Sequence, residues 1–338
     1  MGDQVSTSYA GTLKGLVETL QNLGLDADAI LEEAGVDLQS TSEYDARISL
    51  ETISSIVARV SSSKLGPIFG LKYAESVHAT TYHSFGIMLI SSTSLRKFCE
   101  RLERYYAYIN TTEQTAFTVN GNQAELSYTT VVDFKNNEEA LAQISGWAAT
   151  WLKLIRMAYQ PEYAPLRVTF HCDSPNDELD EFKQHFNCPL EFKAADNKIV
   201  FPVADLDLPF PGGNAELARR SECMVFDYLK NLGRVDTVNA VRITLFDLLP
   251  TGRFALADVA AVMAVEEAQL SHTLKMSNSS YQSILNETRR ELAEEYISRA
   301  DITVGEVAYM LGFSDCSNFA RSFRRWTGKS PSEFRAVL

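Results

Sequence analysis

Hydrophobic positions near the C-terminus recur at helical spacing on either side of a glycine. The apolar stripe of the first predicted helix consists of Val307, Ala308 and Leu311. Gly312 follows as a helix stop that is free to adopt the left-handed conformation. Ser314 and Asp315 suit the start of a second helix, because a side-chain oxygen there can accept an unpaired backbone N–H. The pattern predicts two short helices joined by a tight turn.

The second predicted helix divides into a buried and a polar face. Its buried stripe consists of Phe319, Phe323 and Trp326. Its polar face carries Asn318, Arg321 and Arg325, with Ser317 and Arg324 beside them. Gly328 ends the helix, and Ser330, Pro331 and Glu333 predict a capping box with proline at the first helical position.

This arrangement predicts a helix-turn-helix. Reading a major groove requires a helix that presents donors and acceptors to base edges and holds phosphates at its flanks. The predicted base contacts are Ser317, Asn318 and Arg321, and the predicted phosphate contacts are Arg324, Arg325 and Lys329. The alternative is an ordinary helix hairpin whose arginines form only a solvated face, and the pattern alone leaves it open.

The run LGFSDCSNFARSFRRWTGKSPSEFR resembles the second helix-turn-helix of the AraC/XylS family of bacterial transcription regulators, nearly residue for residue. The most specific marks are the GFSD turn, the F-x-R-x-F-x-R/K-W run and the G-x-S-P-x-E-F/Y-R ending. The resemblance implies an all-α DNA-binding domain over residues 241–338, in which a long helix joins two helix-turn-helix motifs. It also implies promoter DNA and RNA polymerase as partners and a bacterial cytoplasmic location.

The first of the two motifs is expected at Leu256–Met276, where it departs from the family. Ala264 replaces the usual turn glycine, and the recognition helix opens with Glu266 and Glu267 instead of carrying arginines. The outward positions, predicted as DNA contacts, are Ala268, Ser271, His272 and Lys275. Because the two carboxylates would repel phosphate, this motif is expected to add little affinity or to read an unusual half-site.

The helix expected at Tyr281–Ile297 joins the two motifs. Since it is rigid, the two recognition helices should lie about one duplex turn apart, roughly 34 Å, on one face of the DNA.

The front of the chain mixes both periodicities. Residues 1–75 are predicted as helices punctuated by Gly24, Gly35 and Gly66-Pro67, and residues 84–109 continue the helical pattern. Alternation on either side of Asn120-Gly121-Asn122 predicts a β-hairpin. Further predictions are helices at 138–159 and 180–186 and strands at 167–171, 190–193 and 198–201. The front domain is therefore expected to be α+β, with a few antiparallel strands wrapped by helices.

This front domain is similar to the arabinose-binding-like N-terminal sensor domain of one branch of the AraC/XylS family. The similarity lies in SSTSLRKFCERLERYYAYIN, PLRVTFHCDSP, FKQHFNCPLEF and NKIVFPVADLDLPFP. It implies binding of a small-molecule effector, dimerisation, or both, over residues 1–212. Residues 213–240 are expected to connect the two domains. The amphipathic helix in this segment has three interpretations: it joins the domains, it pairs with a second chain, or it is a buried core helix.

The distribution of charge along the chain is compatible with the predicted DNA-binding domain. The net charge of −13 opposes a generally basic nucleic-acid binder. From Ala240 onward, however, the chain has 11 Lys+Arg and 12 Asp+Glu, a sum of −1, so the other −12 lies in the front of the chain.

The five cysteines show no paired spacing and fit a reducing cytosol. The N-terminus lacks a signal-peptide pattern, and no apolar run is long enough for a membrane span.

Enzyme and metal chemistry are not expected. No G-x-S-x-G, phosphate loop or dinucleotide fingerprint occurs. His171, Cys172, His185 and Cys188 are the one constellation with zinc-like residue types. The adjacent His171 and Cys172 would face opposite sides of a strand, so ordinary core or loop roles are favoured over zinc. No cofactor is predicted.

Candidates for effector contact follow only from residue type, since a ligand site is mostly apolar with a few polar groups. They are Tyr82, His83, Tyr105, Tyr106 and Tyr108. The overall hypothesis is a cytoplasmic, effector-controlled, homodimeric DNA-binding regulator that acts as an activator. The alternative is a ligand- or partner-binding protein whose DNA-binding domain is degenerate, as the acidic first motif suggests.

Overall fold

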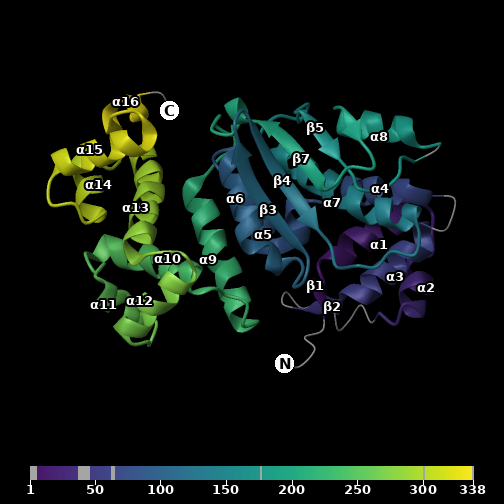
Figure 1. Cartoon of the computed structure of the whole chain (residues 1–338), viewed down its shortest axis with the longest axis horizontal. Coiled ribbons are helices and arrows are strands. Elements are labelled where there is room, and N and C mark those ends of the chain that lie inside the picture. Colours follow the sequence, from purple (N-terminus) through teal and green to yellow (C-terminus); the bar gives the residue numbers. More distant parts are fainter. Residues whose placement is uncertain (1–5, 37–45, 62–64, 176, 300, 337–338) are drawn as a thin grey trace. The chain divides into compact units, whose positions relative to one another are not determined.

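The computed structural model describes residues 6–36, 46–61, 65–175, 177–299 and 301–336 (Figure 1). The chain forms two compact units, residues 1–229 and residues 230–338. The expected fold class is confirmed: the first unit combines helices with a sheet, and the described part of the second unit is helical.

A five-stranded sheet of order β3-β4-β7-β5-β6 organises the first unit. Its strands are β3 Gln114–Asn120, β4 Gln123–Thr129, β5 Arg167–Thr169, β6 Leu190–Glu191 and β7 Asn197–Pro202. β3 and β4 form the predicted hairpin, with Phe117 opposite Leu126, and Gly121 adopts the positive φ of 60° that the turn requires. The neighbours are antiparallel except β5 and β6, which are parallel.

That parallel pair corrects the expectation of an antiparallel sheet. Helix α8 (Leu179–Phe186) lies between β5 and β6 in the chain. A helical crossover returns the chain to its starting end, so the next strand runs in the same direction as the first.

The sheet has one buried and one polar face. Along β4, Ala124, Leu126 and Tyr128 are buried, whereas Glu125 is partly exposed and pairs with Lys198 of β7 at 3.0 Å. Helix α6 (Leu95–Tyr105) packs beside β3, and helix α7 (Asn137–Ala158) packs beside β7 (Figure 1). Period-two alternation therefore places the apolar positions under the helices, as in half-solvated antiparallel sheets.

Helices also pack on one another beside the sheet. They are α1 Thr12–Asn22, α2 Ala27–Glu33, α3 Leu50–Ser61, α4 Phe69–Ser76 and α5 His83–Ile90. Leu13, Leu16 and Leu20 of α1 belong to the hydrophobic core that the first four helices share. A Cβ at Gly70 would lie 1.9 Å from the Ala142 carbonyl oxygen, so glycine allows α4 and α7 to touch.

Two local predictions for this region were wrong. Residues 7–9 and 47–49 form the antiparallel pair β1 and β2 (Thr7–Tyr9 and Arg47–Ser49) rather than helix, because three-residue strands are too short to show alternation. The helical pattern over residues 84–109 is interrupted after α5. Ser94 caps α6 by accepting the Lys97 N–H at 3.3 Å.

Short 3₁₀ helices span Gly66–Ile68, Ala79–Tyr82, Tyr106–Tyr108, Val203–Asp205 and Leu249–Thr251.

Helix α9 (Ala215–Asn231) lies in the segment expected to connect the domains. Its Glu222 is fully buried and lies 3.3 Å from Arg101, while Tyr228 packs against Tyr108 with ring centroids 4.5 Å apart. Its inner face is thus part of the core of the first unit. Leu217 and Met224 of the same helix are exposed.

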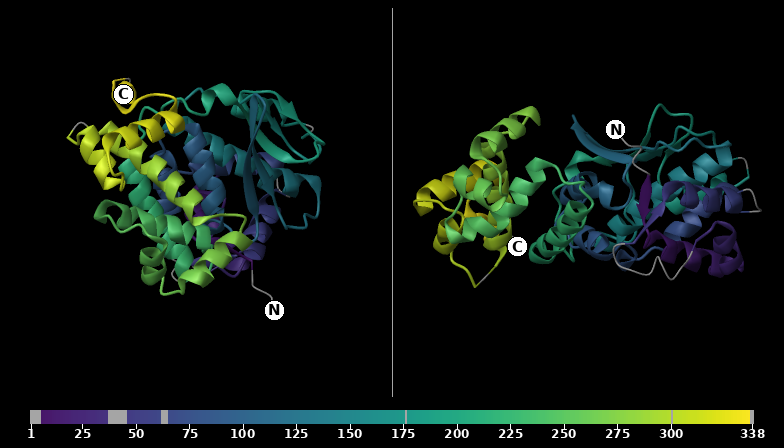
Figure 2. Two further views of the ribbon diagram at one scale, coloured as in Figure 1. Left: turned by 60° about the vertical axis from the view of Figure 1, so that its left-hand side comes forward. Right: turned by 90° about the horizontal axis from the view of Figure 1, so that it is seen from below.

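The described part of the second unit consists of helices and the turns between them. They are α10 Thr237–Leu248, α11 Leu256–Val262, α12 Glu267–Met276, α13 Tyr281–Ser298, α14 Val304–Met310, α15 Cys316–Thr327 and α16 Pro331–Arg335. Arg242 of α10 donates to Glu291 of α13 at 2.9 Å. Within this unit, α13 runs between the pair α11 and α12 and the pair α14 and α15 (Figures 1 and 2).

Candidate nucleic-acid interface and ligand cavity

Helices α14 and α15 form the predicted helix-turn-helix. Thr303 caps α14 in a reciprocal box: its hydroxyl accepts the Glu306 N–H at 3.2 Å, and the Glu306 carboxylate accepts the Thr303 N–H at 2.7 Å. Gly312 makes the turn with a φ of +71°. A Cβ at Gly312 would lie 2.2 Å from the Phe254 ring, so both backbone and packing require glycine there.

Arg289 of α13 supports this turn from below. Its guanidinium donates to the carbonyl oxygens of Leu311 at 2.9 Å and Gly312 at 3.3 Å. It also lies over the rings of Phe254 and Phe313, at 4.8 and 5.1 Å from their centroids. Burial lowers the pKa of Arg289 but leaves it charged. The role of Arg289 is structural, because its Nε and Nη2 groups donate to the backbone of the turn.

The polar face of α15 is open. Phe319 and Phe323 are fully buried and Trp326 is partly buried, which confirms the predicted apolar stripe. The exposed predicted contacts are Ser317, Arg321, Arg324, Arg325 and Lys329, and Asn318 is partly exposed. The burial pattern therefore brings five of these residues onto the side of α15 that faces away from the core, and exposed Lys329 lies beyond the end of the helix.

Asp315 organises the beginning of this helix. Its carboxylate accepts the Asn318 N–H at 2.8 Å, which lowers the pKa of Asp315. The Asn318 amide also donates to Asp315, and its oxygen accepts a hydrogen bond from Arg321. Gly312, Ser314, Asn318, Arg321 and Arg325 help to line a surface hollow at this end of the unit. The chain Asp315–Asn318–Arg321 holds polar groups in fixed positions beside that hollow.

Helices α11 and α12 form the other motif. Ala264 adopts a positive φ of 55°, the conformation that glycine provides at Gly312. Ala268, His272 and Lys275 are exposed and Ser271 is partly exposed, while Leu270 and Leu274 are buried. Glu266 and Glu267 are both exposed at the start of α12. The carboxylates therefore lie at the helix end that would approach DNA.

The first unit contains a cavity of about 130 Å³ between α1, α3, α4 and α7 and the chain around β3 and β4. Tyr82 and Tyr106, two of the predicted effector contacts, line it. Tyr105 and Tyr108 are buried elsewhere, and Tyr108 stacks on Phe85 at 5.3 Å. His83 is exposed at the start of α5. Residue type alone could not separate these tyrosines, because all of them are core residues.

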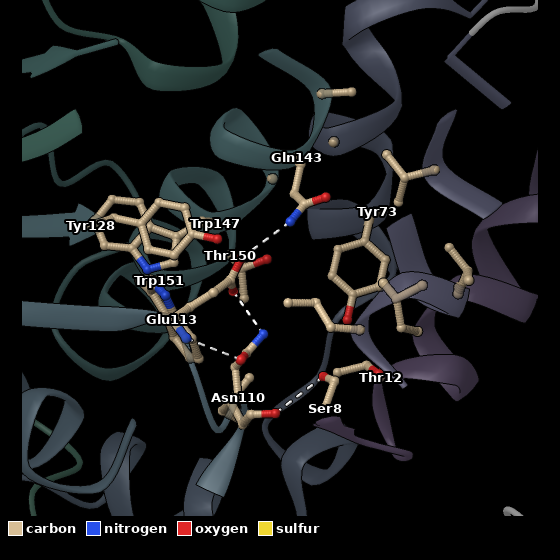
Figure 3. Close-up of a pocket in the computed structure, with 18 of the residues that line it drawn as sticks. Ser8, Thr12, Tyr73, Asn110, Glu113, Tyr128, Gln143, Trp147, Thr150 and Trp151 are labelled. Carbon is tan, nitrogen blue, oxygen red and sulfur yellow. Dashed lines mark hydrogen bonds between the residues drawn. The ribbon is translucent and has the colours of Figure 1, made fainter. Parts of the chain in front are cut away.

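Other residues of the cavity were missed. They include Tyr73, Asn110, Glu113, Tyr128, Gln143, Trp147 and Trp151 (Figure 3). The spacing of Trp147 and Trp151, one helical turn apart, could have shown that they share a face. Nothing in the sequence shows that Glu113, which precedes the hairpin, points inward.

Glu113 is the charged group of the cavity wall. Its carboxylate accepts hydrogen bonds from Asn110 Nδ2 at 2.9 Å and Gln143 Nε2 at 3.2 Å (Figure 3). It accepts a third from Thr130 Oγ1 at 2.8 Å. Burial raises the pKa of Glu113, and hydrogen bonds from Tyr128, Thr130 and Gln143 oppose that rise.

The four zinc-type residues do not form a metal cluster in the described part of the chain. The Cys172 Sγ lies 4.0 Å from His171 Nε2. Burial raises the pKa of Cys172 and of Cys188 to about 11, so neither thiol readily becomes a thiolate ligand. Among the described residues, no cluster of three or more potential metal ligands occurs.

Comparison with protein families matches both parts of the chain. The model of the N-terminal arabinose-binding domain of the AraC transcription regulator matches residues 24–210, more than half of the chain. A helix-turn-helix domain model matches residues 259–336. The chain belongs to the AraC family of transcription regulators.

Relatives in the AraC family cover nearly the whole chain. The ornithine utilization regulator of Pseudomonas aeruginosa is 23% identical over 332 residues, spanning 98% of this chain and 96% of that protein. The regulator VqsM of the same organism is 22% identical over 321 residues, spanning 94% and 95%. The crystal structure of CdpR, also from Pseudomonas aeruginosa, shares the fold, with a TM-score of 0.55, 18% identity and coverage of 96% and 98%.

These comparisons confirm the resemblance read from the sequence. Like its relatives in the AraC family, the chain is a DNA-binding transcription regulator with an N-terminal ligand-binding domain. The relatives are regulators rather than enzymes. In the described ranges, no helix combines the length and apolar character that crossing a bilayer requires.

Proposed function

We propose that this regulator binds promoter DNA sequence-specifically through α15 and responds to a small molecule held in the cavity of its first unit. The observation that carries the proposal is the polar face of α15, where Asp315 holds Asn318 and Arg321 beside exposed arginines. In this proposal Ser317, Asn318 and Arg321 contact bases, and Arg324, Arg325 and Lys329 contact phosphates. In the first motif Ala268, Ser271, His272 and Lys275 contact DNA more weakly.

We further propose that residues 1–212 sense the effector and assemble a homodimer, and that residues 241–338 bind the promoter. The chain then recruits RNA polymerase as an activator in the bacterial cytoplasm, where promoter DNA is found. The ornithine utilization regulator is named for the use of a small metabolite. We propose a comparable metabolic role for this chain.

The test is fluorescence anisotropy with a labelled duplex from the gene's own upstream region, against a scrambled duplex. Selective binding is expected. If three basic side chains each neutralise one phosphate, the affinity should fall about 40-fold between 50 and 200 mM salt. Equal binding to both duplexes, or binding that does not respond to salt, would contradict the proposal.

A second candidate is a ligand- or partner-binding protein whose DNA-binding unit has become degenerate. The exposed Glu266 and Glu267 at the start of α12 favour it, because they would repel phosphate. Absence of selective binding to any fragment of the upstream region, by a chain that still binds small molecules, would support this candidate.

A further inference from the structure

The hydrogen-bond partners of Glu113 indicate which ionisation state its site is built for. Its side chain is buried, and the residue is 7% exposed. Asn110 Nδ2 must be a donor, because Asn110 Oδ1 already accepts the N–H groups of Thr112 at 3.0 Å and Glu113 at 3.1 Å. Thr130 Oγ1 accepts the Val132 N–H at 3.1 Å, so its hydroxyl proton is free to point at Glu113. The surrounding groups are donors, which an ionised carboxylate accepts and a carboxylic acid cannot fully use.

No positive charge in the described chain compensates this carboxylate. The residues that line the cavity include no lysine, arginine or histidine. Within the described ranges Glu113 forms no ion pair. Burial without an opposite charge raises the pKa of Glu113, so a cation entering the cavity would favour the ionised carboxylate and pair with it.

Aromatic rings form much of the remaining wall. Tyr128 stacks on Trp147 with centroids 4.9 Å apart, and Tyr82 lies 5.5 Å from Trp151. The faces of tryptophan and tyrosine attract organic cations, most strongly where water is excluded. The Nε1 groups of Trp147 and Trp151 are buried and find no acceptor within the described part of the chain, so they can donate to an oxygen on the ligand.

The volume restricts the size of the ligand. A cavity of about 130 Å³ is close to the roughly 150 Å³ of an engineered cavity that accepts benzene. The occupant therefore has the size of a benzene ring or a short branched chain. Anions would face the Glu113 carboxylate.

We propose that this cavity binds a small organic cation, a primary or quaternary ammonium, whose charge pairs with Glu113 and whose carbon atoms contact the aromatic wall. The proposal rests on the proposed function of the first unit as the effector-binding unit and gives that effector a chemical class. Glu113 is then the residue that selects for positive charge, and the rings supply contact area.

The test compares cations with neutral molecules of the same shape on the full-length chain. The pairs are choline with 3,3-dimethylbutan-1-ol, benzylammonium with benzyl alcohol, and butylammonium with butanol. Tryptophan fluorescence reports binding, because Trp147 and Trp151 line the cavity. A Trp326→Phe background removes the third tryptophan, which lies in α15. At least one cation is expected to bind about tenfold more tightly than its neutral partner.

Two variants test whether the Glu113 carboxylate causes the preference for cations over neutral molecules. Glu113→Gln keeps the shape but removes the charge, and it should abolish the difference between cation and neutral partner. Glu125→Gln is the matched control, because Glu125 lies on the polar face of β4 and pairs with Lys198; it should bind like the parent chain. If Glu113→Gln does not fold, the comparison of the pairs on the parent chain still decides.

Equal affinity within every pair, failure of all three cations to bind, or an unchanged preference in Glu113→Gln would overturn the proposal. Promoter binding of the parent chain, with Trp326 in place and without probe, is a separate readout. Tight binding of the neutral molecules would keep the cavity as an effector site and reject only the charge assignment. Loss of promoter selectivity alone would reject the proposed DNA function and leave the cation site in place.

Discussion

At the scale of single residues, the DNA-binding unit separates side chains that build the motif from side chains that face outward. Arg289 illustrates the first kind, since its donors are used by the turn at Leu311 and Gly312. Arg321 illustrates the second, since it is exposed and reaches Asn318 on its own helix. Both are arginines of one unit, so only their surroundings distinguish them.

Arg321→Ala should weaken binding to the specific site by about 1–3 kcal/mol and relax the preference at one base position. The reason is that a bidentate arginine discriminates guanine from other bases. Anisotropy with the specific duplex and with single-base variants measures both effects. An equal loss on random DNA would instead make Arg321 a phosphate contact, as Arg324→Ala is expected to show.

The two turns of the helix-turn-helix motifs should respond oppositely to substitution. Ala264 is exposed with a φ of 55°, so Ala264→Gly should raise the free energy of unfolding by about 0.5–1 kcal/mol through relief of the left-handed strain. Gly312→Ala should lower it by more than about 1 kcal/mol, because its Cβ would meet the Phe254 ring. Urea unfolding of both variants measures this. A loss of stability in Ala264→Gly would contradict the strain argument.

His185 should make the chain sensitive to acid. Burial and the charge of Arg156 lower its pKa from 6.5 to about 4, and its Nε2 is buried. Between pH 4 and pH 6.5 His185 is protonated in the unfolded chain and neutral in the folded chain. The free energy of unfolding is therefore highest above about pH 6.5, and it decreases by about 1–3 kcal/mol as the pH falls toward 4. Thermal melts at pH 7 and pH 4.5 should show a smaller difference for His185→Gln than for the parent chain.

At the scale of elements, the two recognition helices differ in charge at the end that would approach DNA. Helix α15 begins with Asp315 engaged by Asn318 and continues into exposed arginines. Helix α12 begins with two exposed glutamates and has Lys275 near its other end. The motifs share a fold but not an electrostatic surface, so we expect unequal contributions to affinity.

Replacing Glu266 and Glu267 with Ser and Arg should strengthen DNA binding by about 1–2 kcal/mol at low salt, because two repulsions from phosphate are removed and one attraction is added. Anisotropy at two salt concentrations should show a steeper salt dependence for the double variant. Unchanged affinity would mean that α12 does not approach the backbone, or that its glutamates already contact base amino groups.

At the scale of the whole molecule, regulation requires that ligand and DNA binding affect each other. If a ligand in the cavity changes the affinity for promoter DNA by some factor, DNA must change the affinity for that ligand by the same factor. Couplings of about 5- to 150-fold are typical. The tightest-binding cation from the fluorescence assay is the probe for this measurement.

Four titrations complete this thermodynamic cycle: promoter DNA with and without the cation, and the cation with and without promoter DNA. Each ligand is expected to change the affinity for the other by the same factor, above about fivefold. A factor near one in both directions would show that the cavity ligand does not control DNA affinity, and control would then act on another step, such as recruitment of RNA polymerase.

Much of the DNA-binding unit could be predicted from the sequence, because its information is local. Helix caps at Asp315 and Ser330, and the buried stripe of Phe319 and Phe323, depend on residues three or four positions apart. The hairpin of β3 and β4 could be predicted for the same reason, since a turn and its flanking alternation are contiguous. Family membership followed from one continuous run of residues.

Only the tertiary structure decided what lies inside the first unit. The cavity joins residues from Ser8 to Trp151, and the partners of Glu113 come from Asn110, Thr130 and Gln143. The burial of Glu113, and the absence of a lysine, arginine or histidine from the described residues that line the cavity, are properties of the fold and not of any window of sequence. The sequence by itself therefore determined that the chain is a DNA-binding regulator, while packing decided which tyrosines line the cavity and that Glu113 lies beside them.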